Sequence, residues 1–375
     1  MPVSSKIPLL DLNRQVQGIR QELDEALQSV LEATAFVNGP SVREFESGFS
    51  AYCETSHCVG VGNGTDALEM IFRALNLQHG DEVITTPMSF IATIEPLVML
   101  GVKPVFADIE PDTYNLDPQQ VAPKITSKTK ALLPVHLYGQ PATMEPLLKL
   151  TAEKKLYLVE DCAQAHGAKY QNKRIGSFGH ASAFSFYPGK NLGAYGDAGA
   201  VTTNDAALAE KVRMLANHGR KTKYEHDIVG TNSRLDTLHA AVLSVKLRHL
   251  DSWNAGRVCV AEAYRERLGD MTELVLPHTA VERTHVYHQF VIRVQEAAKR
   301  DTLLQHLNGN GVGAGVHYPI PLHLQPACKF LGYKTGDFPH AEALGASCIS
   351  LPMFPELTEA EIDYVASTLR AFFGK

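Results

Sequence analysis

The segment from Ala181 to Gly199 reads ASAFSFYPGKNLGAYGDAG. Its first part, residues 181–186, is typical of a buried strand, and a turn restrained by proline and glycine follows. Lys190 therefore lies at the tip of an apolar strand, where desolvation would lower the pKa of its amine toward neutrality. Such an amine can attack an aldehyde and can then carry a proton. The competing interpretation is a solvated loop lysine, the usual fate of any single lysine.

Outward from this turn, short strand-like runs alternate with longer segments of helical period. Helices are predicted over 66–77 and 235–250, where aliphatic and aromatic residues recur on one stripe. Strands are predicted over 58–61, 82–86, 104–107, 131–136, 156–160, 181–186 and 200–203. Most of these strands are apolar on both sides, which is typical of strands covered on both faces. The pattern predicts an α/β fold with a mainly parallel seven-stranded sheet.

The chain has 375 residues, more than the ~250–300 at which single cores usually stop growing, so two domains are expected. After a long helix expected over 251–268, the pattern changes to a strand (286–294), a helix (299–307), a strand (312–318) and two further helical stretches. We predict a large α/β domain over residues 1–250 and a smaller α+β domain over residues 251–375. The boundary is expected within the long helix.

The composition is that of an ordinary globular protein, with 45% hydrophobic and 20% charged residues. A formal net charge of -6 argues against nucleic-acid or anionic-membrane partners, which call for basic patches. The six cysteines form no C-x-x-C pair and the 16 histidines show no metal-ligand spacing, so we expect no metal. The start, from Met1 to Lys6, lacks the pattern of a signal peptide, and no apolar stretch reaches a membrane span. A cytoplasmic location is expected.

A glycine-rich turn from Gly60 to Asp66 reads GVGNGTD and leads from a strand into a helix. Glycines allow close approach to a ligand, and the helix start offers unpaired N–H groups to a phosphate. The plainer alternative is a tight turn with Thr65 as the helix N-cap. The turn matches the dinucleotide-binding fingerprint G-x-G-x-x-G less well, because that fingerprint requires glycine where Thr65 stands.

The strand from Leu156 to Asp161 reads LYLVED and ends in two carboxylates, at the edge where open α/β sheets bind ligands. A carboxylate in a low-dielectric site is costly unless it is paired, and a protonated pyridine nitrogen is a suitable partner. The alternative is that Asp161 only caps the next helix.

Taken together, these motifs resemble the DegT/StrS-type sugar aminotransferases, which are pyridoxal-phosphate enzymes of fold type I. The resemblance extends along nearly the whole chain. Its longest local matches are Val61–Leu68, Pro134–Pro141, Glu160–Ala168, Ser185–Gly199 and Gly230–Asp236. It implies an aspartate-aminotransferase-like fold and pyridoxal 5'-phosphate as cofactor, cycling with pyridoxamine phosphate.

By this resemblance, Lys190 is the catalytic residue that bonds the cofactor covalently, and Asp161 pairs with the pyridinium nitrogen. Gln164 would bond the ring hydroxyl, and Phe90 would stack on the ring, unless Phe90 is simply packed in the core. The phosphate would be held by Gly64, Thr65 and Ser185. Asn232 would reach the cofactor phosphate of a neighbouring subunit, which implies a homodimer with shared active sites.

The resemblance also implies transamination, with glutamate as the expected amino donor and a keto-sugar nucleotide as acceptor. The segment from Gly315 to Pro321, GVHYPIP, resembles the subgroup acting on dTDP- or UDP-linked 3-keto-6-deoxyhexoses. The product would be an amino sugar of a surface polysaccharide such as lipopolysaccharide, or of a secondary metabolite. The predicted substrate contacts are His317 and Tyr318 for the hexose, Arg220, Lys221 and Lys223 for the diphosphate, and Tyr187.

Plainer interpretations of these contacts stay open. His317 could be a histidine whose hydrogen bonds are all made within a proline-rich turn, and the basic stretch with Arg220, Lys221 and Lys223 could simply face solvent. Three rival functions also stay open. The first is a catalytically silent, cofactor-binding regulatory protein. The second is a nucleotide-dependent oxidoreductase supported only by the turn at residues 60–65. The third is an aminotransferase for a 4-keto sugar or a keto-cyclitol.

Overall fold

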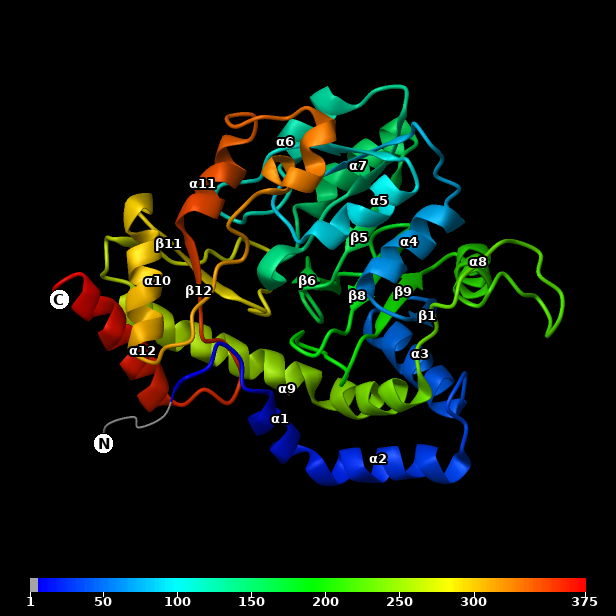
Figure 1. Ribbon diagram of the computed structural model, residues 1–375, viewed down its shortest axis with the longest axis horizontal. Helices are drawn as coiled ribbons and strands as arrows, with labels where there is room; N and C mark the ends of the chain where they lie inside the picture. The colour runs from blue at the N-terminus through cyan, green and yellow to red at the C-terminus, as the bar shows by residue number, and fades with distance from the viewer. Residues whose placement is uncertain (1–5) are drawn as a thin grey trace.

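A seven-stranded sheet forms the centre of the computed structural model, which describes residues 6–375 (Figure 1). The strand order is β1-β9-β8-β5-β4-β2-β3. The strands are β1 His57–Val61, β2 Glu82–Thr85, β3 Lys103–Phe106, β4 Thr129–Leu133, β5 Tyr157–Asp161, β8 Ala181–Ser185 and β9 Gly199–Thr203. Only β9 runs antiparallel to its neighbours, β1 and β8, and the remaining pairs are parallel. The predicted α/β fold with a mainly parallel seven-stranded sheet is confirmed.

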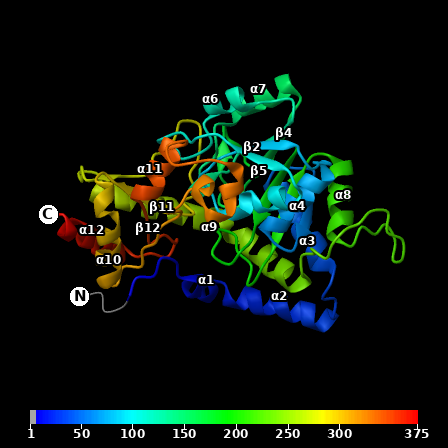
Figure 2. The same ribbon diagram turned by 45° about the horizontal axis from the view of Figure 1, so that its top comes forward.

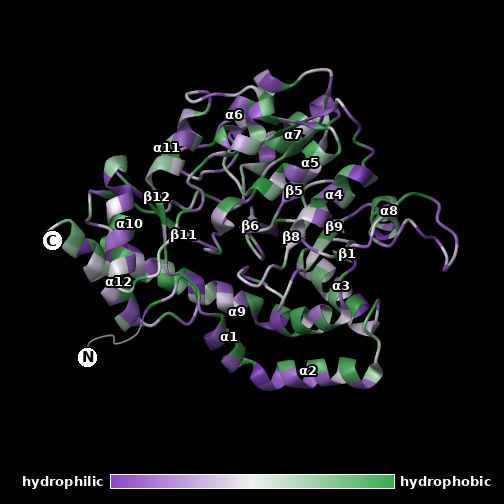
Figure 3. Ribbon diagram, in the orientation of Figure 1, coloured by the Kyte–Doolittle hydropathy of each residue, from purple (hydrophilic) through white to green (hydrophobic). Residues whose placement is uncertain are grey.

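Helices cover both faces of this sheet, so alternate strand residues enter different cores. Val159 and Ala183 pack with α4 and α8 on one face, whereas Phe184 packs with α3 and α9 on the other. The covering helices are α3 Pro40–Tyr52, α4 Gly64–Ala74, α5 Glu95–Met99, α6 Pro118–Val121, α7 Met144–Lys154, α8 Ala206–Ala216 and α9 Thr237–Leu268. Hydrophobic residues concentrate on the central strands (Figure 3). All five residues of β9 are buried, as expected for a strand covered on both sides.

The C-terminal part of the chain builds a second core around a three-stranded antiparallel sheet in the order β10-β11-β12 (Figure 2). Its elements are β10 Leu274–Val275, β11 Phe290–Val294, α10 Arg300–Gly309, α11 Pro339–Ser347, β12 Cys348–Leu351 and α12 Glu359–Phe372. Tyr264, near the end of α9, packs into this core with Phe290 and Phe354. Because α9 runs without interruption through residue 250, the division into domains at residue 250 stays a prediction.

The strand predicted over 312–318 is wrong. This segment makes only isolated bridges, Val312 with Ile7 and Gly315 with Ser350, and the third strand of the small sheet is β12 instead. Pro319 and Pro321 follow directly, and proline cannot donate to a strand ladder. The two helices predicted over 235–250 and 251–268 are the single helix α9.

Three helices precede the sheet and were not predicted: α1 Leu12–Gly18, α2 Arg20–Ala33 and the covering helix α3. Helix α2 packs on α9 through a narrow stripe that includes Leu23 and Val245. A hairpin of β6 Lys169–Tyr170 and β7 Lys173–Arg174 lies between β5 and β8 in the chain. Met1 to Ser5, on which the expectation of no signal peptide partly rests, lie outside the described residues. Within residues 6–375, no helix has the length and apolar character needed to cross a membrane.

Candidate active site

The parallel strands β5 and β8 lie side by side, so their carboxyl ends bring Asp161 and the turn that carries Lys190 to one edge of the sheet. We call this turn, residues 187–194, the lysine turn. In the turn, Lys190 N donates to the Tyr187 carbonyl at 2.8 Å, and Ala194 N donates to the Phe186 carbonyl at 2.7 Å. Burial lowers the pKa of the Lys190 amine to about 8, although the nearby Asp161 charge opposes this. Lys190 therefore has the environment of a nucleophilic amine rather than that of a solvated loop lysine.

Asp161 is a buried carboxylate with few compensating contacts. Its Oδ2 accepts from Thr93 Oγ1 at 2.8 Å, and its Oδ1 accepts from Ala163 N at 3.2 Å. Burial raises the pKa of Asp161, and these two hydrogen bonds offset the rise only in part. A cationic ligand would stabilise the charged form. No helix follows β5, so the expectation that Asp161 might cap the next helix is wrong; it caps only a short turn.

The start of α4 approaches the end of β8 closely. A Cβ atom added to Gly64 would lie 2.6 Å from Ser185 Cβ, so only glycine allows this approach. The first turn of α4 begins beside Ser185, and because N–H groups at a helix start lack partners within the helix, this is a suitable place for a phosphate. We call Gly64, Thr65 and Ser185 the phosphate cradle. The cap of α4 is Asn63, whose side chain accepts from Asp66 N at 2.8 Å, so the interpretation of Thr65 as N-cap is wrong.

Gln164 and Tyr318 meet although 154 positions separate them in the sequence. Gln164 Nε2 donates to Tyr318 Oη at 3.0 Å, and Gln164 Oε1 accepts from Tyr138 N at 2.8 Å. The Phe90 and Tyr318 rings lie 5.9 Å apart between centroids. Because the Phe90 side chain is 54% exposed, it is not part of the packed core, and its flat face is free to contact a ligand.

His317 and Tyr187 complete this side of the site. His317 Nδ1 lies 2.8 Å from Ser350 Oγ, so one ring nitrogen is satisfied within the protein, as the plainer interpretation of this residue requires. Burial and the nearby Lys190 lower the pKa of His317, which favours a neutral ring. Tyr187 is exposed beside the lysine turn.

Four predicted site residues lie elsewhere, on the segment that connects α8 to α9. This segment projects from the body of the molecule (Figures 1 and 2). Lys221 forms an ion pair with Asp227 at 3.8 Å, and Lys223 lies over the ring of Tyr224. Arg220 bonds Asn217 at 2.9 Å, and the exposed Asn232 pairs with Asn217 through the backbone. Within residues 6–375, these contacts join the four residues to their own segment and not to Lys190.

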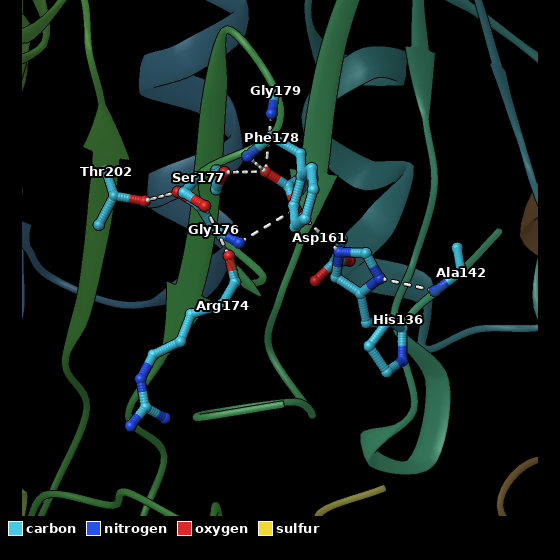
Figure 4. A network of polar contacts seen from close by, with 12 residues as sticks. His136, Ala142, Asp161, Arg174, Gly176, Ser177, Phe178, Gly179 and Thr202 are labelled. Atoms are coloured by element: carbon cyan, nitrogen blue, oxygen red, sulfur yellow. Dashed lines mark hydrogen bonds and ion pairs between the residues drawn. The ribbon is translucent and has the colours of Figure 1, made fainter. Parts of the chain in front are cut away.

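Glu160, the other carboxylate at the end of β5, belongs to a buried network that includes His136 and the turn from Gly176 to Gly179 (Figure 4). His136 Nε2 lies 3.1 Å from Glu160 Oε2, and His136 Nδ1 accepts from Ala142 N at 3.0 Å, so the ring proton is on Nε2. Glu160 also accepts from Gly176 N, Phe178 N, Gly179 N and Ser182 Oγ at 2.8–3.0 Å. Burial acts to raise the pKa of Glu160, but these bonds outweigh it and hold the pKa below its ordinary value.

Cys162 lies close to His136 and Glu160, and the three side chains could in principle surround a metal ion. The carboxylate, however, already accepts five hydrogen bonds. Burial raises the pKa of the Cys162 thiol, so the thiolate that a metal requires is disfavoured. The network therefore holds protein segments together and does not offer a metal site.

Thr93 is a site residue that the sequence analysis did not identify. It ends the short helical turn η1 Ile91–Thr93, which follows β2, and it donates to Asp161. Residues after β2 reach the same sheet edge as the ends of β5 and β8, because all three strands are parallel. The position of Thr93 shortly after a predicted strand is therefore a signal that could have identified it.

Comparison with known proteins places this geometry in a family. The profile of the DegT/DnrJ/EryC1/StrS aminotransferase family matches residues 17–370. A Geobacillus stearothermophilus protein named "Pleiotropic regulatory protein" is 45% identical over 371 residues, which cover 98% of each chain. The "dTDP-3-amino-3,4,6-trideoxy-alpha-D-glucose transaminase" of Streptomyces venezuelae is 44% identical, covering 97% of this chain and 96% of its own. The crystal structure of S. venezuelae DesV with a ketimine intermediate superposes with a TM-score of 0.96 at 43% identity, covering 99% and 100% of the two chains. The chain therefore belongs to the DegT/DnrJ/EryC1/StrS aminotransferase family.

Proposed function

We propose that this protein is a pyridoxal-phosphate-dependent aminotransferase that aminates a keto-sugar carried on a nucleoside diphosphate. The observation that carries the proposal is that β5 and β8 bring Lys190 and the buried carboxylate of Asp161 to one edge of the sheet, where Asp161 accepts only two hydrogen bonds. A protonated pyridine nitrogen would supply a cationic partner for Asp161, and the phosphate cradle would hold the other end of the same molecule. The residues present therefore fit this cofactor.

When bound, pyridoxal phosphate supplies an aldehyde for the lysine amine and a ring that withdraws electrons from the carbon bearing the amino group. Asp161 would keep the ring nitrogen charged, and Gln164 would bond the ring hydroxyl. Phe90 would cover one face of the ring. Lys190 would attach the cofactor, leave when an amino donor replaces it, and then move the proton at the reacting carbon. The cofactor would alternate with pyridoxamine phosphate, and the proposed donor is glutamate.

The proposed acceptor is a 3-keto-hexose linked to dTDP or UDP, with a 6-deoxy sugar as the preferred form. Support comes from the Streptomyces venezuelae relative, whose name specifies a dTDP-3-amino sugar. Tyr187 is exposed in the lysine turn, and Tyr318 contacts Gln164 and Phe90. Together with His317, these residues would contact the hexose. The resulting amino sugar would enter a surface polysaccharide or a secondary metabolite. A 4-keto sugar and a keto-cyclitol are the alternative acceptors.

We also propose a homodimer with shared active sites. The segment between α8 and α9, which contains Arg220, Lys221, Lys223 and Asn232, projects in part from the body of the molecule (Figure 2). A projecting segment suits residues that act in a neighbouring subunit. In that position Asn232 would bond the cofactor phosphate, and the three cations would offset the charge of the sugar diphosphate.

A regulatory protein that binds the cofactor without turnover is the second candidate, because one relative is named a pleiotropic regulatory protein. Adding glutamate to the cofactor-loaded protein separates the two functions. An aminotransferase converts the visible absorbance of the loaded protein to that of the amine form, whereas a silent binding protein leaves it unchanged. Next, a panel of 3-keto and 4-keto nucleotide sugars identifies the acceptor by the mass of the aminated product. Borohydride reduction and peptide mapping must place the label on Lys190; a label elsewhere would reject the proposal.

A further inference from the structure

Asn191, the residue after Lys190, is buried and fully hydrogen-bonded, with 2% of its surface exposed. Its Nδ2 donates to Asn254 Oδ1 and to the Val286 carbonyl, both at 2.9 Å. Its Oδ1 lies 3.3 Å from His288 Nδ1, which donates to it. A carbonyl can only accept, so the bond to Val286 fixes which end of the amide carries nitrogen. We call Asn191, Asn254, Val286 and His288 the amide clamp.

The partners of Asn191 come from segments far apart in the sequence. Asn254 belongs to α9, and its own Nδ2 donates to the His166 carbonyl at 2.8 Å. His166 lies shortly after Gln164, in the segment that follows β5. Val286 and His288 lie just before β11. The amide clamp therefore joins the lysine turn to α9, to the chain leading into the small sheet, and to the segment that carries the predicted ring contacts.

We propose that Asn191 is a positioning residue for Lys190, with Asn254 as its buried support. The lysine turn is not held by a strand ladder, and a lysine side chain is long and flexible. Fixing the backbone at residue 191 fixes the direction in which the side chain of residue 190 leaves the turn. A fully satisfied buried polar network is rigid, because each member loses its partners if another moves. This inference rests on the proposed function, since it concerns the attack of Lys190 on its cofactor.

Asn191→Asp tests this arrangement with almost no change in shape. The new oxygen would face two acceptors, Asn254 Oδ1 and the Val286 carbonyl, where Nδ2 now donates. We expect the limiting rate of covalent attachment of pyridoxal phosphate to the apo-protein to fall about 10–100-fold, as for a displacement of about 1 Å at a reacting group. The cofactor concentration giving half the limiting rate should stay within about twofold, because the phosphate cradle is not part of the clamp.

A second variant avoids a new charge beside the lysine. Asn254→Ser removes the acceptor of Asn191 from α9 and leaves the lysine turn unaltered in sequence. The limiting rate should fall in the same direction, by roughly 3–10-fold. The control is Asn308→Asp, where an exposed amide near the end of α10 also donates to two carbonyls, those of Leu304 and Ala314. It should attach the cofactor at the unaltered rate.

Thermal unfolding of each apo-protein establishes that the variants are folded. If Asn191→Asp fails to fold, the folded Asn254→Ser protein decides the question. An unaltered limiting rate in the folded variants would overturn the inference alone. A fall in rate accompanied by an equal rise in the half-saturating concentration would also overturn it, because that pattern indicates a generally loosened site. Failure of the unaltered protein to attach the cofactor at Lys190 would overturn both the inference and the proposed function.

Discussion

Replacing Gly64 by alanine should weaken cofactor binding and leave the fold intact. The added Cβ would lie 2.6 Å from Ser185 Cβ and 3.1 Å from Ser185 Cα. Because nonbonded carbon atoms settle about 3.5–4.0 Å apart, the start of α4 and the end of β8 must separate by about 1 Å. Both Ser185 atoms are fixed to a strand, so they cannot move aside as the end of a long side chain could.

The cost to stability should be small. Overpacking of this kind costs about 1–3 kcal/mol of unfolding free energy, and the higher helix propensity of alanine offsets up to about 1 kcal/mol. The remaining loss of about 0–3 kcal/mol is tolerable for a protein whose stability is of the order of 5–15 kcal/mol. The same displacement of about 1 Å at the phosphate cradle should raise the dissociation constant for pyridoxal phosphate roughly 10–100-fold.

Equilibrium dialysis of the apo-protein against pyridoxal phosphate measures this constant, and thermal unfolding of the same samples checks the fold. Gly309→Ala is the matched control, because no heavy atom lies within 4 Å of a Cβ added at this position in α10. It should bind the cofactor as the unaltered protein does. A folded Gly64→Ala protein with unchanged affinity would refute the assignment of the phosphate cradle.

Three further predictions concern charges and assembly. Glu160→Gln should lower the free energy of unfolding by about 3–5 kcal/mol in denaturant titrations, because an amide cannot accept from all the donors around it. The pKa of Glu160 is depressed in the folded state, so the stability that its charge contributes is present above the ordinary glutamate pKa and is lost as the pH falls through the folded pKa. The Glu160→Gln protein lacks this titration and should therefore lose less stability on acidification than the unaltered protein. The rate of cofactor attachment to Lys190 in the apo-protein should rise with pH and level off above the pKa of the amine, about 8. Because the Asp161 carboxylate raises this pKa, Asp161→Asn should move the midpoint of the rise to lower pH. Mixing Lys190→Ala and Asn232→Ala proteins should restore activity, since each mixed dimer contains one intact site and one site with both changes. No restoration despite subunit exchange would contradict the shared-site arrangement.

Features that depend on a local pattern could be predicted from the sequence. The strands of the large sheet are short apolar runs between turns, and parallel strands place their carboxyl ends at one edge. Asp161, Lys190 and the turn before α4 each follow such a strand, so their meeting can be anticipated without coordinates. Composition and spacing did not identify the cofactor, which came from the resemblance of the motifs to a family.

Features that depend on packing between distant segments could not be predicted. Thr93 is an ordinary threonine until folding places its hydroxyl beside Asp161. The segment at 312–318 has strand-like residues, but its partners are single bridges, whereas β12 gains a full ladder with β11. Nor does a sequence indicate that the basic segment after α8 projects from the body of the molecule.

The two adjacent carboxylates at the end of β5 show why the number of donors, and not burial alone, determines the state of a charge. Successive side chains of a strand point to opposite faces, so only one of Glu160 and Asp161 can face the lysine turn. Both are buried, yet the pKa of Glu160 is lowered and that of Asp161 is raised. Glu160 accepts five hydrogen bonds, which compensate for its lost hydration, whereas Asp161 accepts two. The protein thus satisfies one carboxylate completely and leaves its neighbour to gain stability from a cationic ligand, which is what a pyridinium nitrogen would provide.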